Sequence, residues 1–413
     1  MQQVIVIGGG VIGLSSAWWL LEAGFCVQLV EREPVVAAGA SHSNGGQLSY
    51  RYVSPFADEG VPLKAMQWMF QQDGPLRFKP EADLRQWRWL AQFLAHCRAD
   101  INRSTTARLL VLGELSRQSL VQLEMVVPKT QFAWREAGKL VVYRSPKQFD
   151  AAVGRVNGAD IGQVLTAAQC IALEPALAAA QGLLAGGIYN SGEAVADCQA
   201  FCYALMARIK THPRFGGVVH AAVRGFNKTK GEITGIDTDR GALAADAYVL
   251  AAGIRSRDLA ATAGIDLPLY PIKGYSLTAP IRDTDLAPQV SVTDFERKVL
   301  YARIGDKLRV AAMADIVGED RGLDPRRVAG LIAQVQTMMP GAANYGRLSA
   351  WSGLRPATPD GAPIIGATPY KNLWLNVGHG GLGFTFACGS ARILADLMRR
   401  KVPPIAMDGL SLR

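Results

Sequence analysis

The sequence predicts an α/β protein in which a Rossmann-like dinucleotide-binding domain carries a second, sheet-based α+β domain inserted into it. Three observations predict this fold. A glycine-rich loop stands between a strand and a helix within residues 4–22, and a second glycine-rich loop opens a helix near residue 380. The chain has 413 residues, a length that suggests two or three domains. Because the two loops stand at opposite ends of the chain, we expect a discontinuous cofactor domain.

The N-terminal segment has the pattern of a βαβ unit. Residues 4–7 form a short β-branched run, which is typical of a strand buried on both faces. The helix after it is marked by apolar residues at helical spacing and by a terminal glycine: Leu14, Ala17, Trp18, Leu21 and Gly24. Residues 25–30 have the pattern of a second buried strand. Such a unit requires a right-handed crossover and a parallel sheet.

The pattern G-x-G-x-x-G lies between the first strand and its helix. The first glycine permits a tight turn, the second lets the backbone reach a pyrophosphate, and the third allows close packing of helix and strand. The helix N-terminus adds free N–H groups and a partial positive charge. An acidic residue ends the next strand, where it can accept hydrogen bonds from ribose hydroxyls. The expected contacts here are Gly8, Gly10, Val11, Ile12, Gly13, Glu31 and Arg32. This loop alone leaves NAD and FAD open.

Three further segments favour a flavin dinucleotide. Residues 41–47 are rich in small, hydrogen-bonding side chains, residues 246–253 predict a strand ending in a small-residue turn, and residues 376–383 form the second glycine-rich loop. A flavin ring lies far from its adenine end, and a positive helix end there would stabilise charge on the N1–C2=O edge of the reduced ring. The expected cofactor contacts from these segments and their surroundings are Ser41, Asn44, Gly45, Gly46, Gln47, Val223, Ala251, Gly253, Gly380, Gly381, Leu382, Gly383 and Thr385.

The remaining elements are expected to divide between the two domains. Helices are predicted around 62–70, 81–97, 104–124, from 198, and 384–400; strands around 139–144, 217–223, 245–252, 270–279, 297–312 and 373–377; and a hairpin around Lys230 and Gly231. We expect the cofactor domain to comprise residues 1–50, 195–265 and 350–413. The substrate domain is then expected to comprise 51–194 and 266–349.

Composition excludes several classes of protein. The net charge is +9, but the basic residues are scattered and no run exceeds Arg399–Lys401, so we expect no nucleic-acid partner. No uninterrupted apolar run reaches about 18 residues, so we expect no transmembrane helix. Six cysteines are too few for a disulfide scaffold, and Cys198 and Cys202 lack metal-ligating neighbours, so we expect no metal. We expect a cytoplasmic protein, with peripheral contact at the inner face of the cell membrane as an open alternative.

Four motifs carry a family resemblance over nearly the whole chain. They are Gly-Val-Pro-Leu-Lys-Ala at 60–65, Tyr-Pro-Ile-Lys-Gly-Tyr-Ser at 270–276, Trp-Ser-Gly-Leu-Arg-Pro-Ala-Thr-Pro-Asp-Gly at 351–361, and Leu-Trp-Leu-Asn-Val-Gly-His-Gly at 373–380. The sequence resembles the bacterial FAD-dependent D-amino acid dehydrogenases (small-subunit type), within the glycine oxidase and D-amino acid oxidase flavoproteins. The resemblance implies oxidative deamination of D-amino acids, with hydride passing from the α-carbon to flavin N5. It also implies hydrolysis of the imine to a 2-oxo acid and ammonia, and electron transfer to a quinone or respiratory acceptor.

The resemblance also assigns candidate roles within the site. Arg355, in the Gly-Leu-Arg-Pro motif, is expected to bind the substrate carboxylate as a bidentate guanidinium, the alternative being an ion pair with Asp360. Tyr275 is expected to donate to the same carboxylate, the alternative being a packed aromatic side chain. No general base is evident; His379 and His42 are the candidates, each with a structural alternative. Some relatives attach FAD through a histidine near this position, and because the resembling segment here reads Ser-Asn-Gly-Gly at 43–46 we expect non-covalent FAD.

Residues 50–52 depart from the family pattern, which tends to carry smaller residues there. Strand alternation would place Tyr50 and Tyr52 on one face, where two aromatic rings would line the substrate pocket. This hypothesis favours a cyclic substrate such as D-proline or a 4-hydroxy-D-proline over D-alanine. The alternative is a surface or interdomain segment.

The tryptophan- and arginine-rich segment at 85–98 has two readings. One is an interfacial helix that docks on anionic lipid beside a quinone. The other is a buried helix of the substrate domain whose arginines extend outward. Two other functions also remain open: an amine or glycine/sarcosine-type oxidase of the same fold that releases hydrogen peroxide, and a non-catalytic dinucleotide-binding sensor.

Overall fold

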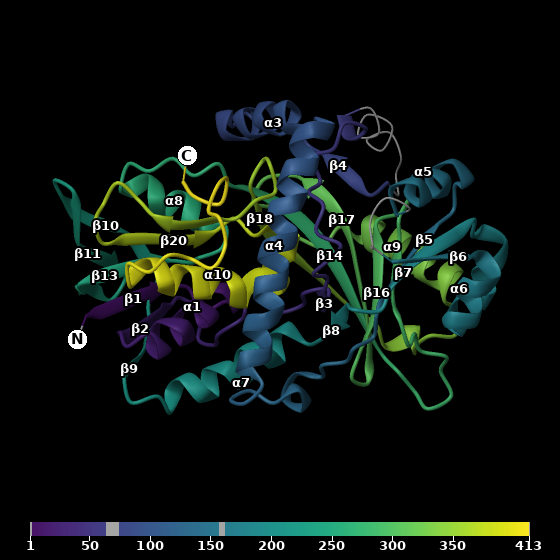
Figure 1. Ribbon diagram of the computed structural model, residues 1–413, viewed down its shortest axis with the longest axis horizontal. Helices are drawn as coiled ribbons and strands as arrows, with labels where there is room; N and C mark the ends of the chain where they lie inside the picture. The colour runs from purple at the N-terminus through teal and green to yellow at the C-terminus, as the bar shows by residue number, and fades with distance from the viewer. Residues whose placement is uncertain (1, 63–73, 157–161, 413) are drawn as a thin grey trace.

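Two large β-sheets lie side by side along the long axis of the molecule (Figure 1). The structure is a computed structural model that describes residues 2–62, 74–156 and 162–412. The predicted α/β fold, with a Rossmann-like parallel sheet and a second, sheet-based part, is confirmed; the second sheet is mostly antiparallel. The helix predicted at 62–70 lies almost entirely outside the described residues.

The first sheet contains six strands drawn from three separate stretches of the chain. In spatial order they are β19 (Ile364–Ala367), β20 (Leu373–Val377), β13 (Ala247–Leu250), β1 (Gln3–Ile7), β2 (Cys26–Glu31) and β9 (Phe215–His220). All neighbours are parallel except β19 and β20. The carboxyl ends of β1, β2, β13 and β20 therefore meet at one edge, which is where ligands bind in open α/β sheets.

Helices cover one face of this sheet. They are α1 (Val11–Glu22), α7 (Cys198–Lys210), α10 (Gly383–Met398) and α4 (Ala99–Leu123), and Figure 1 shows α4 crossing in front of α10. Gly389 brings α10 close to α4, because its N–H donates to Ser116 Oγ at 3.1 Å and a β-carbon there would lie 2.8 Å from Ser116 N. The expected assignment of 51–194 to the substrate domain is therefore wrong for α4, which packs on the cofactor side.

The other face is covered by α8 (Arg255–Thr262) and a small antiparallel sheet. That sheet consists of β10 (Val223–Thr229), β11 (Glu232–Thr238) and β12 (Gly241–Leu243). The hairpin predicted around Lys230 and Gly231 joins β10 to β11. Gly231 adopts φ +79°, a conformation that glycine tolerates best.

The second sheet contains nine strands. In spatial order they are β18 (Ser349–Ala357), β14 (Tyr270–Pro280), β17 (Lys307–Ile316), β16 (Val299–Ile304), β15 (Ser291–Asp294), β5 (Lys139–Tyr143), β7 (Gly186–Asn190) and β6 (Gln163–Thr166), with β4 (Leu76–Phe78) paired to β17. The single strand predicted at 297–312 is wrong, because a turn at Gly305 (φ +59°) divides it into β16 and β17. The expected boundary at 350 also falls inside β18, which belongs to this sheet.

One face of the second sheet forms a hydrophobic core. It packs against α9 (Pro325–Met338), α6 (Ala167–Leu173) and η2 (Pro175–Leu183). The helix α5 (Pro146–Val156) lies at the far end, and the short pair β3 (Gln47–Leu48) and β8 (Ala194–Val195) joins the two halves. The opposite face of the sheet is turned toward a cleft.

The tryptophan-rich segment forms α3 (Leu84–His96) at the edge of the molecule (Figure 1). Trp89 is buried, stacks on Phe93 and donates from Nε1 to the Ala357 carbonyl at 2.9 Å. Trp87 and Leu94 remain about half exposed, at 48% and 53%. Part of the helix is therefore pinned to the second sheet, and part of its apolar surface faces outward. Across the described ranges, no helix combines the length and apolarity needed to cross a bilayer.

Candidate active site

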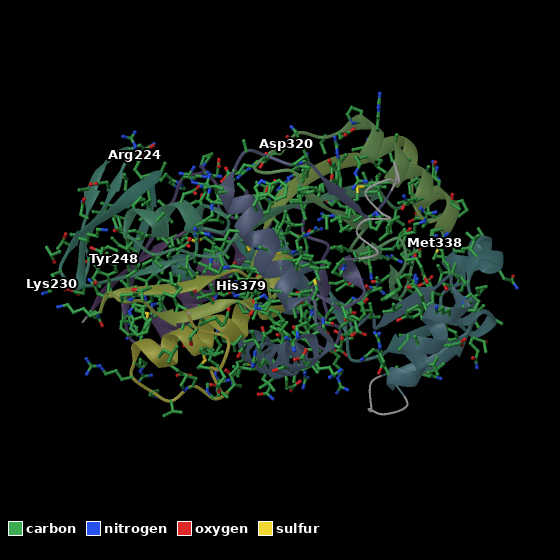
Figure 2. All side chains as sticks on the ribbon, turned by 90° about the horizontal axis from the view of Figure 1, so that it is seen from above. Arg224, Lys230, Tyr248, Asp320, Met338 and His379 are labelled. Carbon is green, nitrogen blue, oxygen red and sulfur yellow. The ribbon has the colours of Figure 1, made fainter. Side chains whose placement is uncertain are left out.

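One large cleft of about 2410 Å³ runs between the two sheets. It extends from the carboxyl ends of β1 and β2, past the first turn of α10, to the face of the second sheet that carries Arg355. Figure 2 shows His379, beside the start of α10, near the middle of the long axis. The cleft therefore has the extent that a dinucleotide and a small substrate require.

The nucleotide end is built on close backbone packing at the first glycine-rich loop. Gly8 has φ +110°, and a β-carbon there would lie 2.6 Å from the Ala251 carbonyl oxygen. A β-carbon at Gly13 would overlap the Gly8 carbonyl oxygen. Gly10 is the N-cap of α1 and has no side chain to cap the helix. The first turn of α1 therefore presents backbone amides to the cleft. The turn at Gly8 and the close packing at Gly13 agree with their predicted roles, and contact of Gly10 with a pyrophosphate stays a prediction.

Glu31 is held firmly at the end of β2. Its carboxylate accepts the Gly9 N–H at 2.5 Å and the Glu33 N–H at 2.9 Å. A carboxylate has about four acceptor sites, so these two bonds leave capacity for ribose hydroxyls. Both Glu31 and Arg32 line the cleft, and their contact with a cofactor stays a prediction.

The loop at 41–47 is tied to both halves of the molecule. Ser41 Oγ accepts the Val11 N–H at 3.1 Å, and the Asn44 carbonyl accepts from Arg309 Nη1 at 2.6 Å. Gly45 lies against the second sheet, where a β-carbon would be 3.2 Å from the Ala311 methyl group. The loop therefore crosses from one sheet to the other as the floor of the cleft.

The second glycine-rich loop leads directly into α10. Gly378 and Gly380 have φ +82° and +52°, a single turn of η4 (Gly380–Leu382) follows, and α10 begins at Gly383. The N-terminus of this 16-residue helix faces the cleft. Its unpaired amides and partial positive charge suit an anionic edge of a ligand.

Most predicted cofactor residues line this cleft. They are Gly8, Gly10, Val11, Ile12, Glu31, Arg32, Ser41, Asn44, Gly45, Gln47, Val223, Ala251, Gly253, Gly380, Gly381, Leu382 and Gly383. The other three predicted cofactor contacts do not line the cleft and are packed behind its wall. Gly13 packs on Gly8, Gly46 packs on the Ala196 carbonyl, and Thr385 Oγ1 accepts the Ser49 N–H at 3.3 Å. These three residues support the wall of the cleft and do not line it.

Arg355 projects from β18 into the cleft. Its Nη1 donates to the Met313 carbonyl at 2.7 Å, and a β-carbon at the neighbouring Gly274 would overlap its guanidinium. Met313 has φ +68° at a register shift between β14 and β17, which turns its carbonyl toward the arginine. Burial lowers the pKa of Arg355, an effect that Asp315 partly opposes. The guanidinium keeps further N–H donors for a carboxylate.

Tyr275 is among the residues that line the cleft, but its ring packs in the core behind β14 and not beside Arg355, so its predicted contact with the substrate carboxylate is not supported. Because Gly274 faces the arginine, Tyr275 points to the opposite face of β14. There it belongs to the core packed against α9, with Lys273 Nζ 5.2 Å from its ring centroid. Burial, followed by the charge of Asp315, raises its pKa. This corresponds to the alternative reading of a packed aromatic side chain.

Tyr50 and Tyr52 do not share a face as predicted. Regular strand geometry ends at Leu48, and the carboxylate of buried Glu193 then accepts the N–H groups of Tyr50 at 2.6 Å and Arg51 at 2.8 Å. Tyr50 is only 4% exposed and packs in the core with α4, whereas Tyr52 is 40% exposed and lines the cleft. Tyr52 alone remains a candidate for substrate contact.

The two candidate histidines are held by structural contacts. His379 is buried, its Nε2 lies 3.1 Å from Ser390 Oγ, and burial lowers its pKa to about 3. Such an imidazole stays neutral and is a weak base. His42 is exposed, with Nδ1 2.5 Å from Gln199 Nε2, and does not line the cleft. Neither geometry supports a general base.

Sequence reasoning missed Lys139, a buried lysine at the start of β5. Its Nζ donates to Gln47 Oε1 at 2.7 Å and to Ser49 Oγ at 2.9 Å, and it lines the cleft. The available signal was a lysine at the head of an otherwise apolar strand, Lys-Leu-Val-Val-Tyr. The pattern predicted the strand but gave no reason to expect its first side chain in the site.

Comparison with known proteins identifies the family. The family described as FAD dependent oxidoreductase matches residues 3–397. The chain is 46% identical over 409 residues to a protein named D-amino acid dehydrogenase 2 of Pseudomonas aeruginosa, covering 99% of this chain and 98% of that one. It is 43% identical to a protein of the same name from Ralstonia nicotianae, covering 98% of each.

A solved structure extends the likeness to the fold. The glycine oxidase of Geobacillus kaustophilus superposes with a TM-score of 0.77 at 21% identity, covering 100% of this chain and 99% of that one. The glycine-rich loop after β1, the Glu31 carboxylate at the end of β2 and the N-terminus of α10 at the far end of the cleft fit FAD.

Proposed function

Because the chain belongs to the FAD-dependent oxidoreductases, we propose that it oxidatively deaminates D-amino acids in this cleft. The observation that carries the proposal is Arg355, a half-buried guanidinium on the cleft wall beside Gly381, in the turn that leads into α10. The names of the D-amino acid dehydrogenases that match nearly the whole chain support the substrate class. When bound, FAD supplies a two-electron hydride acceptor.

The residues have distinct roles in this proposal. Arg355 binds the substrate carboxylate and fixes the orientation of the α-carbon, while Gly274 and the Met313 carbonyl position its guanidinium. Tyr52 forms part of the wall beside the substrate side chain. Loss of hydride from the α-carbon of a neutral amine needs no dedicated base. The resulting imine then takes up water to give a 2-oxo acid and ammonia.

The test is anaerobic reduction of the purified flavoprotein. Mixing it with a panel of D- and L-amino acids is expected to bleach the yellow flavin band with D-amino acids only, with ammonia and 2-oxo acid forming in a 1:1 ratio. Bleaching by L-amino acids alone, or by no amino acid, would overturn the proposal. The second outcome is the one that a non-catalytic sensor predicts.

We further propose that FAD is held without a covalent bond. Of the described residues that line the cleft, none is a cysteine and one is a histidine, His379. That imidazole points to Ser390 on α10 and is buried. A covalent link would have to break this arrangement.

The electron acceptor is proposed to be a quinone met at a membrane surface, with the enzyme on the cytoplasmic side. The outward residues of α3 support this, because Leu84, Trp87 and Leu94 are 84%, 48% and 53% exposed. Trp87, Leu94 and the exposed Phe56 also line the cleft, so apolar surface continues from the helix into the site.

A vesicle experiment tests the acceptor. Turnover with a long-chain quinone in anionic vesicles is expected to exceed turnover with oxygen at least about tenfold, and Leu94→Glu is expected to reduce sedimentation with the vesicles. Met125→Glu, at another exposed apolar site outside α3 (92% exposed), is the matched control. Equal sedimentation of both variants contradicts membrane contact, and stoichiometric peroxide in air favours the oxidase alternative.

A further inference from the structure

Lys139 presents a buried cation to the cleft. On β5 the side chains of Leu140 and Val142 enter the core on the far face of the sheet, so Lys139 and Val141 face the cleft. The lysine is 4% exposed. Its Nζ lies 4.2 Å from the centroid of the Tyr52 ring, within the range of a cation–π contact.

The groups around this ammonium compensate its charge only in part. Gln47 Oε1 and Ser49 Oγ are neutral acceptors, and Tyr52 offers a ring face. The carboxylate whose charge acts on Lys139 is that of Glu193 beside β8, and its two oxygens are engaged by the N–H groups of Tyr50 and Arg51. Burial lowers the pKa of Lys139 to about 8, and Glu193 opposes that shift.

An ammonium carries three N–H donors, and the described residues accept two from Lys139. A buried charge gains most when its remaining donor also finds an acceptor. Arg355 lies in the same cleft and occupies the substrate carboxylate in the proposed function. In the proposed function the side chain of the substrate is then the group available to supply an acceptor for Lys139.

The geometry points to Lys139 as the residue that selects D-amino acids with an acceptor oxygen on the side chain, carboxylates most strongly. This inference rests on the proposed function and deepens it by naming a substrate class. A side-chain carboxylate completes the hydrogen bonds of the ammonium. A cationic side chain is repelled, and an alkyl side chain leaves the donor unpaired.

The pH dependence follows from the charge of the lysine. Below a pKa of about 8 the amine is protonated and attracts an anionic side chain. Above it the amine is neutral, so the preference for the acidic substrate declines as pH rises through this value. A bound anion moves the midpoint upward, because it stabilises the protonated form.

The first measurement is the ratio of kcat/KM for D-glutamate to that for D-glutamine, which have the same length and differ in charge. The wild-type ratio near pH 7 is expected to be about 10 to 100, the range for a hydrogen bond to a charged group. Lys139→Met is expected to bring the ratio close to 1. Lys139→Arg is expected to keep the preference and to remove its decline with pH, because a guanidinium does not titrate in this range.

Two outcomes overturn the inference: a wild-type enzyme that prefers D-lysine to D-glutamate, or a ratio that Lys139→Met leaves unchanged in protein with normal flavin content. If Lys139→Met does not fold, the wild-type pH profile and the Lys139→Arg variant provide the test of the inference. A flat wild-type ratio across pH then counts against the lysine.

A binding measurement separates this inference from the proposed function. Dissociation constants for glutarate and for its half-amide are read from the perturbation of the flavin spectrum, without turnover. Glutarate is expected to bind wild type about tenfold or more tightly than the half-amide, and Lys139→Met to lose that difference. If no D-amino acid bleaches the flavin, the proposed function fails, while the glutarate comparison still tests Lys139.

Discussion

Replacing Arg355 with methionine is expected to lower kcat/KM for D-amino acids by about 30- to 5,000-fold. Removing one partner of a buried, hydrogen-bonded charge pair costs about 2–5 kcal/mol, which corresponds to that range. The loss should appear as a raised KM together with a lowered kcat, because the guanidinium both binds the carboxylate and orients the α-carbon. Steady-state kinetics with the best substrate of the panel measures it. An unchanged KM would show that Arg355 does not bind the substrate.

Gly274→Ala tests the same contact without altering the arginine. The backbone of Gly274 suits any residue, but an added β-carbon would overlap the guanidinium. The side chain must then leave the Met313 carbonyl, and we expect KM to rise about tenfold or more while FAD content stays normal. Gly216→Ala is the matched control, since it also lies in a strand and its β-carbon would have contacts of 3.5 Å or longer. Equal kinetics in both variants would show that the packing at Gly274 does not position Arg355.

The parts of the fold that sequence predicted best are those set by local patterns. The βαβ start, the hairpin at Gly231 and the strand Leu373–Val377 depend on periodicity and turn chemistry within about ten residues. The placement of α4 depends instead on Gly389, more than 250 residues away, which allows its close approach to α10. No local pattern carries that information, so the domain boundaries were less well predicted than the elements.

The candidate site divides in the same way. Glycines whose backbone must approach another chain segment closely could be identified from the motif that contains them, and Gly8 and Gly13 have the expected packing. The direction in which a side chain points at a tertiary contact could not be predicted from the sequence. Tyr275 faces away because Gly274 faces Arg355, and Tyr50 turns into the core because Glu193 binds the backbone at 50 and 51. The position of Lys139 in the site likewise depends on contacts between residues far apart in the sequence, which no local pattern predicts.

Gly13→Ala is expected to weaken FAD binding. A β-carbon at Gly13 would overlap the Gly8 carbonyl, which is backbone and cannot rotate away. Helix α1 must then separate from the turn after β1, and the amides at its N-terminus move away from the pyrophosphate. Overpacking costs of about 1–3 kcal/mol correspond to a Kd for FAD raised about 5- to 150-fold. Flavin fluorescence titration of the apoprotein measures this Kd.

The control for this variant is Gly154→Ala in α5, where a β-carbon would meet nothing within 4 Å. It is expected to retain wild-type FAD content and to be slightly more stable, since alanine favours a helix over glycine by up to about 1 kcal/mol. Acid precipitation of the wild type and of this control is expected to leave the yellow colour in the supernatant. A yellow pellet would contradict non-covalent binding, whereas wild-type FAD affinity in Gly13→Ala would contradict the role of the loop. The acid-precipitation result is needed first, because a covalently attached flavin would stay on Gly13→Ala whatever happened to the loop, whereas the affinity of a non-covalently bound flavin reports on the loop.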